Sequence, residues 1–205
     1  MLSYLFTGTT THLFLAAVPF YTQYVFGSAG LTSLFMGAFL APAVLAGPMW
    51  LAISRRLGKQ RGLLLSQMVF IAGSLALSTG GVLGVALTTI VIVLLGLSFA
   101  GLQLFAFSML PDAVAAAERN GTSRAGAYTG VWTATEATGT AIGPYVYSAV
   151  LAVGGFVSTT AGQEVVQSGA AQSALVVGIT VVPAMLMLVA ILFQARCRLD
   201  RGTPS

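Results

Sequence analysis

Residues 110–143 read LPDAVAAAERNGTSRAGAYTGVWTATEATGTAIG, and the rest of the chain is best understood from this stretch. It begins with the longest polar run between two apolar segments. It then enters a long apolar segment in which one carboxylate, Glu136, lies among threonines and a tryptophan. A charged side chain at the centre of a membrane helix costs at least about 2.5–3.5 kcal/mol, so it is normally shielded by protein or by a wet cavity. We therefore expect the other segments to form a scaffold around the helix that carries Glu136.

The composition of the chain points to a membrane protein. Its 205 residues are 57% hydrophobic and only 7% charged, and the mean hydropathy is +0.91. Soluble domains carry roughly 25% charged residues. The sequence therefore predicts an integral membrane protein. Its single cysteine, Cys197, excludes a disulfide bond within the chain.

Six apolar segments are long enough to span a membrane, which takes about 17–25 residues. They lie near residues 2–26, 31–53, 62–80, 83–109, 125–154 and 173–195. The segments are continuous apolar runs without strand-like alternation, which predicts helices and not a barrel. We therefore expect an all-α membrane protein, with a domain of six transmembrane helices over residues 1–195 and a cytoplasmic tail over residues 196–205.

The basic residues predict how the chain is oriented. All nine lie in the second link, in the fourth link or in the tail: Arg55, Arg56, Lys59, Arg61, Arg119, Arg124, Arg196, Arg198 and Arg201. The positive-inside rule then places both termini and these two links in the cytoplasm, with the protein in the plasma or cytoplasmic membrane. The same distribution accounts for the net charge of +4 without a nucleic-acid partner.

Small residues and aromatic residues suggest how the helices pack. Two glycine pairs, Gly126/Gly130 and Gly139/Gly143, give the fifth segment small faces that would allow close helix approach. Most aromatic residues lie within a few turns of predicted helix ends, where anchoring in the membrane interface is the default interpretation. These residues are Tyr4, Tyr21, Tyr24, Trp50, Tyr145 and Tyr147.

Residues 48–61 read PMWLAISRRLGKQR. They resemble the P-x-W-x-x-L-[SA]-x-R-x-G-K-x-R pattern of the glycoside–pentoside–hexuronide:cation symporters, the melibiose-permease group of the major facilitator superfamily. The resemblance continues with Asp112, with Arg124-Ala125-Gly126 and with the aromatic residues of 128–132, and loosely with residues 147–156. It covers nearly the whole chain but only the second half of the family's twelve helices.

This resemblance implies a secondary transporter of a sugar or glycoside, coupled to Na⁺ or H⁺ and working by alternating access. It also implies a second six-helix half, from a separate chain, a second copy or residues missing from this reading frame. One departure concerns the eleventh helix of the family, which often carries lysine in a Q-K-x-G pattern. Here the corresponding residues are Glu136-Ala137-Thr138-Gly139, and the main cation-site carboxylates of the family belong to the half that this chain lacks.

Glu136 is the first candidate for a substrate or proton site. It lies eleven residues after Ala125, which is ~16 Å along a helix and near the middle of a ~30 Å hydrocarbon core. On a helix, Glu136 shares one face with Thr129, Thr133 and Thr140, and Trp132 lies beside that face. The functional interpretation is a site in a central cavity. The alternative is a structural glutamate held by hydrogen bonds.

Two polar residues of the first segment are further candidates. His12 lies ~15 Å into its predicted helix, directly after three threonines. It would contact the solute or a proton, or it would simply bond to a neighbouring hydroxyl or carbonyl group. Gln23 is a weaker candidate for the same site.

Charged residues of the two cytoplasmic links could form a gate. These residues are Asp112, Arg119 and Arg124 in one link, and Arg55, Arg56 and Lys59 in the other. One interpretation is a charge latch that holds the cytoplasmic side closed. The other is a pair of solvated links that merely obey the topology rule.

We expect no enzyme and no cofactor apart from the coupling ion. With one histidine and one cysteine the chain has no obvious metal-ligand set, and it contains no phosphate-binding loop. The expected partners are membrane lipid, a small solute and a second six-helix half. The competing hypothesis is a non-transporting membrane subunit that binds or stabilises another membrane protein.

The topology can be tested with a cysteine at Gln60, in a chain whose native Cys197 is replaced by serine. This cysteine should be protected from a membrane-impermeant thiol reagent in intact cells, because the second link is predicted to be cytoplasmic. It should react once the cells are opened. Labelling from outside intact cells would contradict the topology.

Overall fold

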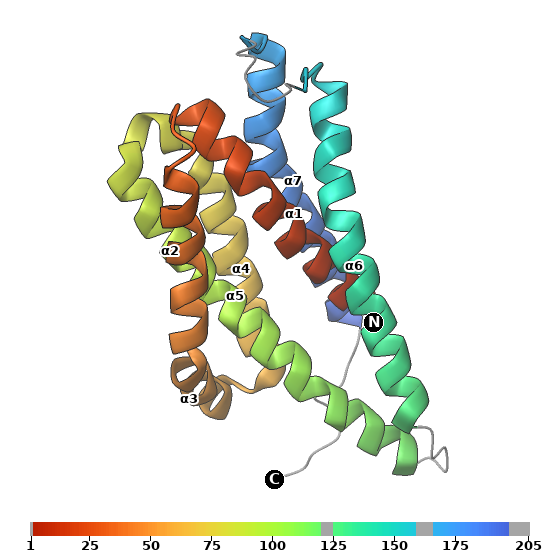
Figure 1. Ribbon diagram of the computed structural model, residues 1–205. Coiled ribbons are helices and arrows are strands. Elements are labelled where there is room, and N and C mark those ends of the chain that lie inside the picture. Colours follow the sequence, from red (N-terminus) through yellow and green to blue (C-terminus); the bar gives the residue numbers. More distant parts are fainter. Residues whose placement is uncertain (1, 120–124, 159–165, 197–205) are drawn as a thin grey trace.

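The computed structural model describes residues 2–119, 125–158 and 166–196, and helices make up most of this part of the chain (Figure 1). The helices are α1 (Leu2–Val25), α2 (Leu31–Leu45), α3 (Gly47–Leu57), α4 (Lys59–Ala76), the short 3₁₀ helix η1 (Leu77–Thr79), α5 (Gly80–Arg119), α6 (Ala125–Val153) and α7 (Gly169–Arg196). No strand occurs in the described ranges, so the all-α prediction is confirmed for them. The predicted tail lies outside the described residues from position 197 onward.

The helices form two groups, which are joined by the packing of α7 against α4 and by α1 between them. Figure 1 shows α2, α3, α4 and α5 on one side and α6 and α7 on the other, with α1 running obliquely between them. Helix α1 packs most extensively against α6 and α7, whereas α5 packs mainly against α2 and α4. The first helix therefore makes its main contacts with the last two.

The second predicted helix is broken in the structure. Helices α2 and α3 meet at Ala46 with a bend of 53°. Proline explains the position of the break, because Pro48 lies in the first turn of α3, where its missing N–H group is tolerated. The basic link, expected to be a loop, is helical on both sides of Gly58, whose φ of +81° makes the turn into α4.

Helix α5 is longer than the predicted segment 83–109. It continues through Pro111 to Arg119, because the residues that follow the proline, DAVAAAER, favour helix strongly. Near its start the helix is interrupted at Gly84, which has a φ of +75°. Part of the polar link between the fourth and fifth segments is thus an extension of the helix.

Two stretches are long and apolar enough to cross a membrane, judged by length and composition: Lys59–Pro111 and Gly169–Ala195. The bent pair α2 and α3 would be a third. The first stretch contains two antiparallel helices, because Gly62 of α4 lies against Phe105 of α5 while Gly73 lies against Leu95. Helices α1 and α6, with 24 and 29 residues, are long enough to span but less apolar, so six crossings remain a prediction.

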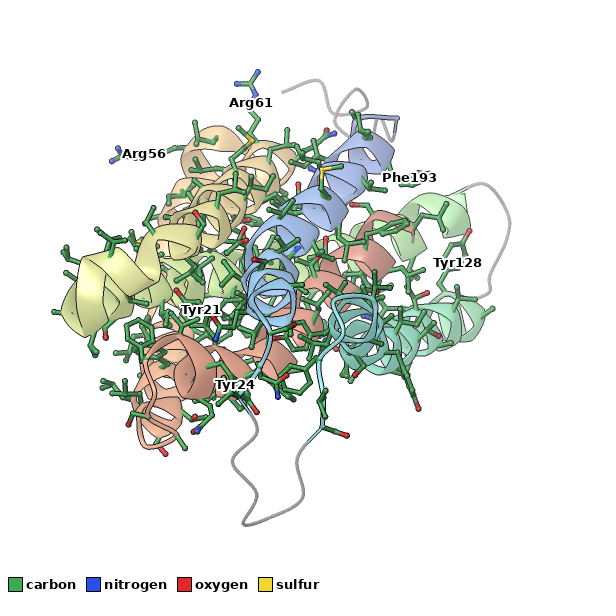
Figure 2. All side chains as sticks on the ribbon, turned by 90° about the horizontal axis from the view of Figure 1, so that it is seen from above. Tyr21, Tyr24, Arg56, Arg61, Tyr128 and Phe193 are labelled. Carbon is green, nitrogen blue, oxygen red and sulfur yellow. The ribbon has the colours of Figure 1, made fainter. Side chains whose placement is uncertain are left out.

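Several basic residues lie together at one end of the helices. Lys59 Nζ donates a hydrogen bond to the carbonyl oxygen of Ser108 in α5 (3.2 Å), and Gln194 Nε2 of α7 donates to that of Gln60 (3.3 Å). The start of α4 therefore meets the C-terminal parts of α5 and α7. Arg56 and Arg61 point outward there (Figure 2). The assignment of this end to the cytoplasm stays a prediction.

Three of the six aromatic residues predicted to anchor in the interface are buried between helices instead. The Tyr21 hydroxyl donates to the Leu77 carbonyl oxygen (2.6 Å), and Trp50 Nε1 donates to that of Leu97 (2.7 Å). The Tyr147 ring packs edge-on against Phe20 and is buried. The anchoring interpretation is wrong for these three residues, because their rings are buried between helices. Two of them also donate to backbone carbonyl oxygens inside the protein.

One glycine pair of α6 brings this helix into backbone contact with α1. A Cβ atom on Gly143 would lie 2.6 Å from Leu13 N and 2.7 Å from Thr9 O, and one on Gly139 would lie 3.1 Å from Thr9 N. The prediction of close helix approach is therefore confirmed for Gly139/Gly143. For Gly126 and Gly130 it stays a prediction, because no atom of the described residues lies within 4 Å of an added Cβ there.

The substitution Gly143→Ala tests this contact. The added methyl group would meet the backbone of α1, which cannot move aside cheaply, so we expect a loss of about 1–3 kcal/mol of stability and a lower Tm in detergent. Gly130→Ala on the same helix is the matched control, because it gains the same helix propensity in open space. Equal Tm values for the two variants would contradict the tight packing.

Candidate functional site

The contact between α1 and α6 aligns the polar side chains of both helices in one row. The row contains Tyr4 and His12 of α1 and Trp132, Glu136 and Thr140 of α6. Gly8 of α1 and Gly139 of α6 lie within this row, where the two backbones touch. The close approach is what allows short side chains such as Thr140 to reach the opposite helix.

Glu136 has an aromatic neighbour at one end of the row. The Tyr4 hydroxyl lies close enough to the Glu136 carboxyl group for the two groups to interact electrostatically. The Tyr4 ring also stacks on the indole of Trp132, with ring centroids 3.9 Å apart and an interplanar angle of 19°. Both Tyr4 and Glu136 are half-buried, so the carboxylate is shielded by protein without being sealed from its surroundings.

Trp132 lies beneath this pair. Only 8% of the residue is exposed, and Phe107 of α5 packs against the indole from another side at 5.9 Å between ring centroids. Its Nε1 atom has no hydrogen-bond partner among the residues that the structure describes. An unpaired N–H group at a buried position is costly, which makes this atom a natural donor to a bound molecule.

His12 lies at the other end of the row and contacts both helices. Its Nδ1 atom is 2.9 Å from the carbonyl oxygen of Gly8, so this nitrogen carries a proton. Its Nε2 atom is 3.3 Å from Thr140 Oγ1, and the Thr140 hydroxyl donates its proton to the carbonyl oxygen of Glu136 (3.0 Å). The histidine thus makes the carbonyl and hydroxyl contacts of the structural interpretation and also belongs to the candidate site.

Only part of the predicted threonine face of α6 contacts α1, and the rest of it is exposed. At about 3.6 residues per turn, Glu136 and Thr140 lie toward α1, whereas Thr133, Ala137 and Pro144 form an exposed flank beside them. Thr133 donates to the carbonyl oxygen of Thr129 on its own helix (3.1 Å). The flank on the other side of α6 is exposed and apolar, with Val131, Ile142 and Tyr145.

Gln23 is not part of the row. It is exposed on α1 and lies eleven residues after His12, which corresponds to ~16 Å along the helix. The structure therefore separates this candidate from Glu136.

The structure describes part of the predicted gate. Arg55 and Arg56 are exposed at the end of α3, and Lys59 binds the carbonyl oxygen of Ser108 on α5. Asp112 and Arg119 belong to α5, but their side chains, like the whole of Arg124, lie outside the described part. The charge latch therefore stays a prediction.

Two residues of the site were not foreseen as such from the sequence. Tyr4 was interpreted as an interface anchor, although it precedes Gly8 and His12 by one and two helical turns on the same face. Phe107 lies on another helix, and no sequence spacing links it to Trp132. The first could have been found by extending the polar face of α1 toward its start, whereas the second required the structure.

The arrangement can recognise a polar molecule. A carboxylate accepts hydrogen bonds, an indole N–H donates one, and a hydroxyl beside an imidazole can do both. Among the described residues, no group of three or more His, Cys, Asp or Glu side chains is placed to hold a metal ion.

Comparison with known proteins identifies the family of the chain. No curated protein matches the sequence significantly. A family model described as MFS/sugar transport protein matches residues 1–201, which is nearly the whole chain. The protein therefore belongs to this sugar-transport family of the major facilitator superfamily.

Proposed function

We propose that this chain acts as one six-helix half of a secondary transporter that moves a sugar or glycoside by symport with H⁺ or Na⁺. The observation that carries the proposal is the half-buried Glu136 side chain, which follows Trp132 by about one turn of α6. The indole N–H of Trp132 has no hydrogen-bond partner in the part of the chain that the structure describes. The family match supports transport of sugars. The resemblance of residues 48–61 to the melibiose-permease group supports the coupling to a cation.

The polar groups of the row suit a sugar. A sugar presents several hydroxyl groups, each able to donate and accept, together with apolar C–H faces. Glu136 would accept from one hydroxyl, Trp132 would donate to another, and Thr140 and His12 would bind further along the row. Binding pockets of this kind combine aromatic walls with a few polar groups that fix orientation.

Alternating access requires a second half that closes against this one. The exposed flank of α6 supports such a partner, because Thr133, Ala137 and Pro144 are small or polar and are poorly suited to contact lipid alone. We propose that this flank faces the second six-helix unit. The apolar flank with Val131 and Ile142 would face lipid.

The same flank also fits the competing function, a subunit that binds another membrane protein without transporting. The two functions differ in what Glu136 does. A transporter needs this carboxylate for uptake, whereas a purely structural subunit does not.

The variant Glu136→Gln tests the transport role. Glutamine keeps the shape and one acceptor but cannot titrate. Loss of a hydrogen bond to a charged group is worth about 1.5–3 kcal/mol, so uphill sugar uptake should fall at least about tenfold. The measurement is uptake and counterflow of labelled mono- and disaccharides in membrane vesicles across a pH series.

Thr138→Val serves as the matched control for this experiment. Thr138 lies on the far side of α6 and donates to the carbonyl oxygen of Ala134 on its own helix, so its loss should leave uptake unchanged. If Glu136→Gln abolishes uphill uptake but spares counterflow, Glu136 carries the coupled proton. If both variants retain wild-type uptake and pH profile, the proposed role of Glu136 is wrong.

The partner-facing flank is tested by a pair of bulky substitutions. Ala137→Trp should disrupt association with a second six-helix unit, because it places a large ring on the proposed contact. Ala149→Trp is the control, since Ala149 is also exposed but lies about 120° round the helix, toward the apolar flank. The mass of the purified complex in detergent measures association, and an equal effect of both substitutions would argue against the assignment.

A further inference from the structure

We infer that the outer face of α2 and α3 binds an anionic phospholipid, whose phosphate group is held by Arg55 and Arg56. The acyl chains of this lipid lie along the exposed apolar side chains that precede the two arginines on the same face. This inference goes beyond the proposed function, because it involves neither the solute nor Glu136.

Two neighbouring rows of side chains run along the outside of α2 and α3, and each row ends in an arginine. The first row contains Leu45, Met49, Ala52 and Arg56, and the second contains Val44, Pro48, Leu51 and Arg55; all of them are exposed. Within each row the residues follow one another at intervals of three or four positions, which places them on one face of a helix. The intervals hold across the break, because the backbone of Ala46 stays in the right-handed helical region (φ −78°, ψ −6°). Apolar side chains and charges therefore share one continuous face.

The apolar part of this face is strongly exposed. Val44 is 82% exposed and Leu45 is 77% exposed, and Met49 and Leu51 follow at 42% and 49%. Single exposed apolar residues are normal in any protein, but a contiguous patch marks a surface for a membrane or a partner. Because this patch leads directly to two charged side chains, it fits a molecule that is apolar along most of its length and charged at one end.

The bend between α2 and α3 sets the two arginines at an angle to α2. Helix α3 turns 53° away from α2, and its last turn carries Arg55 and Arg56. A helix with basic and apolar residues can lie at the membrane interface, where its apolar side chains enter the bilayer and its charges reach the headgroups. The predicted cytoplasmic location of these arginines fits this arrangement, because anionic lipids give the cytoplasmic leaflet a negative surface potential.

The opposite side of α3 is fixed to the protein by Trp50. This residue is only 3% exposed, and its Nε1 atom donates to the carbonyl oxygen of Leu97 in α5 (2.7 Å). Its ring system also packs edge-on against Phe105. At 100° per residue Trp50 lies on the side of α3 away from the two rows. The helix is therefore held with its arginines facing outward.

The two arginines are available to an anion. Neither has an ionic partner in the part of the chain that the structure describes, and Arg56 points away from the helices (Figure 2). Lys59 differs from them, because it donates to the carbonyl oxygen of Ser108. A guanidinium group offers paired N–H donors that match the oxygens of a phosphate. A soluble phosphate ion would meet the same donors but would leave the apolar rows uncovered, so the face as a whole fits a phospholipid.

The experiment measures lipid binding to the full chain in detergent micelles by native mass spectrometry. Its probes are dioleoyl phosphatidylglycerol, which is anionic, dioleoyl phosphatidylcholine, which has the same chains and no net charge, and glycerophosphoglycerol, the anionic headgroup alone. The variants are Arg56→Gln and the double change Arg55→Gln with Arg56→Gln. Arg61→Gln is the matched control, because it removes one charge from the same end of the helices, on a side chain that points another way (Figure 2).

Phosphatidylglycerol should bind the wild-type chain roughly 30-fold more tightly than phosphatidylcholine, because each arginine at an anionic headgroup adds about fivefold in affinity. Arg56→Gln should weaken this binding about fivefold, and the double variant should bind both lipids equally. Arg61→Gln should match the wild type. Glycerophosphoglycerol should bind at least about tenfold more weakly than the lipid, since it buries no acyl chain. The substituted arginines are all exposed, so an unchanged Tm checks that each variant is folded.

Equal binding of the two lipids to the wild-type chain would overturn the inference. So would an unchanged affinity in the double variant, which would leave both arginines to the charge latch. Equal losses in Arg56→Gln and Arg61→Gln would refute the site, because they would show attraction by general charge. Headgroup binding as tight as lipid binding would make the ligand a soluble phosphate and would also refute it. If the double variant loses a second six-helix unit but keeps its lipid, the face belongs to that unit and the inference is wrong.

Discussion

The backbone contact between α1 and α6 at Gly139 and Gly143 is the constraint on which the candidate site depends. A side chain at either position would push the helices apart, because the neighbouring atoms belong to the backbone of α1. At this short distance Tyr4 reaches Glu136, and Thr140 reaches His12. Helix association in membranes relies on such packing, since lipid tails are as apolar as the side chains between helices. The glycines thus place the polar groups and stabilise the helix pair at the same time.

Helices α1 and α6 also contain many polar residues, above all threonines, and these residues make the two helices less apolar. Their threonines largely satisfy themselves, since each hydroxyl donates to a carbonyl oxygen one turn back: Thr7 to Ser3, Thr10 to Phe6, Thr135 to Val131 and Thr138 to Ala134. A hydroxyl paired in this way can enter a low-dielectric region at little cost. Glu136, His12 and the indole of Trp132 cannot be satisfied within their own helix turns alone. These three side chains are therefore the candidates for function among the many threonines of α1 and α6.

Much of the fold could be predicted from the sequence, and the failures have physical reasons. The predicted segment 125–154 agrees closely with α6, because a continuous apolar run is a strong local signal. The break between α2 and α3 and the extension of α5 past Pro111 were missed, because proline can end a helix, bend it or lie in its first turn. Helical spacing predicted that Glu136 and Thr140 share one side of α6, and both contact residues of α1. The stacking of Tyr4 on Trp132 could not, because it depends on which residues of two distant helices lie level with each other.

The position of α1 in the chain has a consequence for biosynthesis. Within this sequence α1 is made before α2 to α5, yet its main partners, α6 and α7, are made last. During synthesis the polar groups of α1 are therefore present in the membrane or at the insertion machinery before α6 and α7 have been made. The threonines can wait at little cost because they are bonded to their own helix, but Tyr4 and His12 acquire their partners on α6 only at the end. The candidate site is thus among the later parts of this sequence to form, because it needs α1 and α6 together.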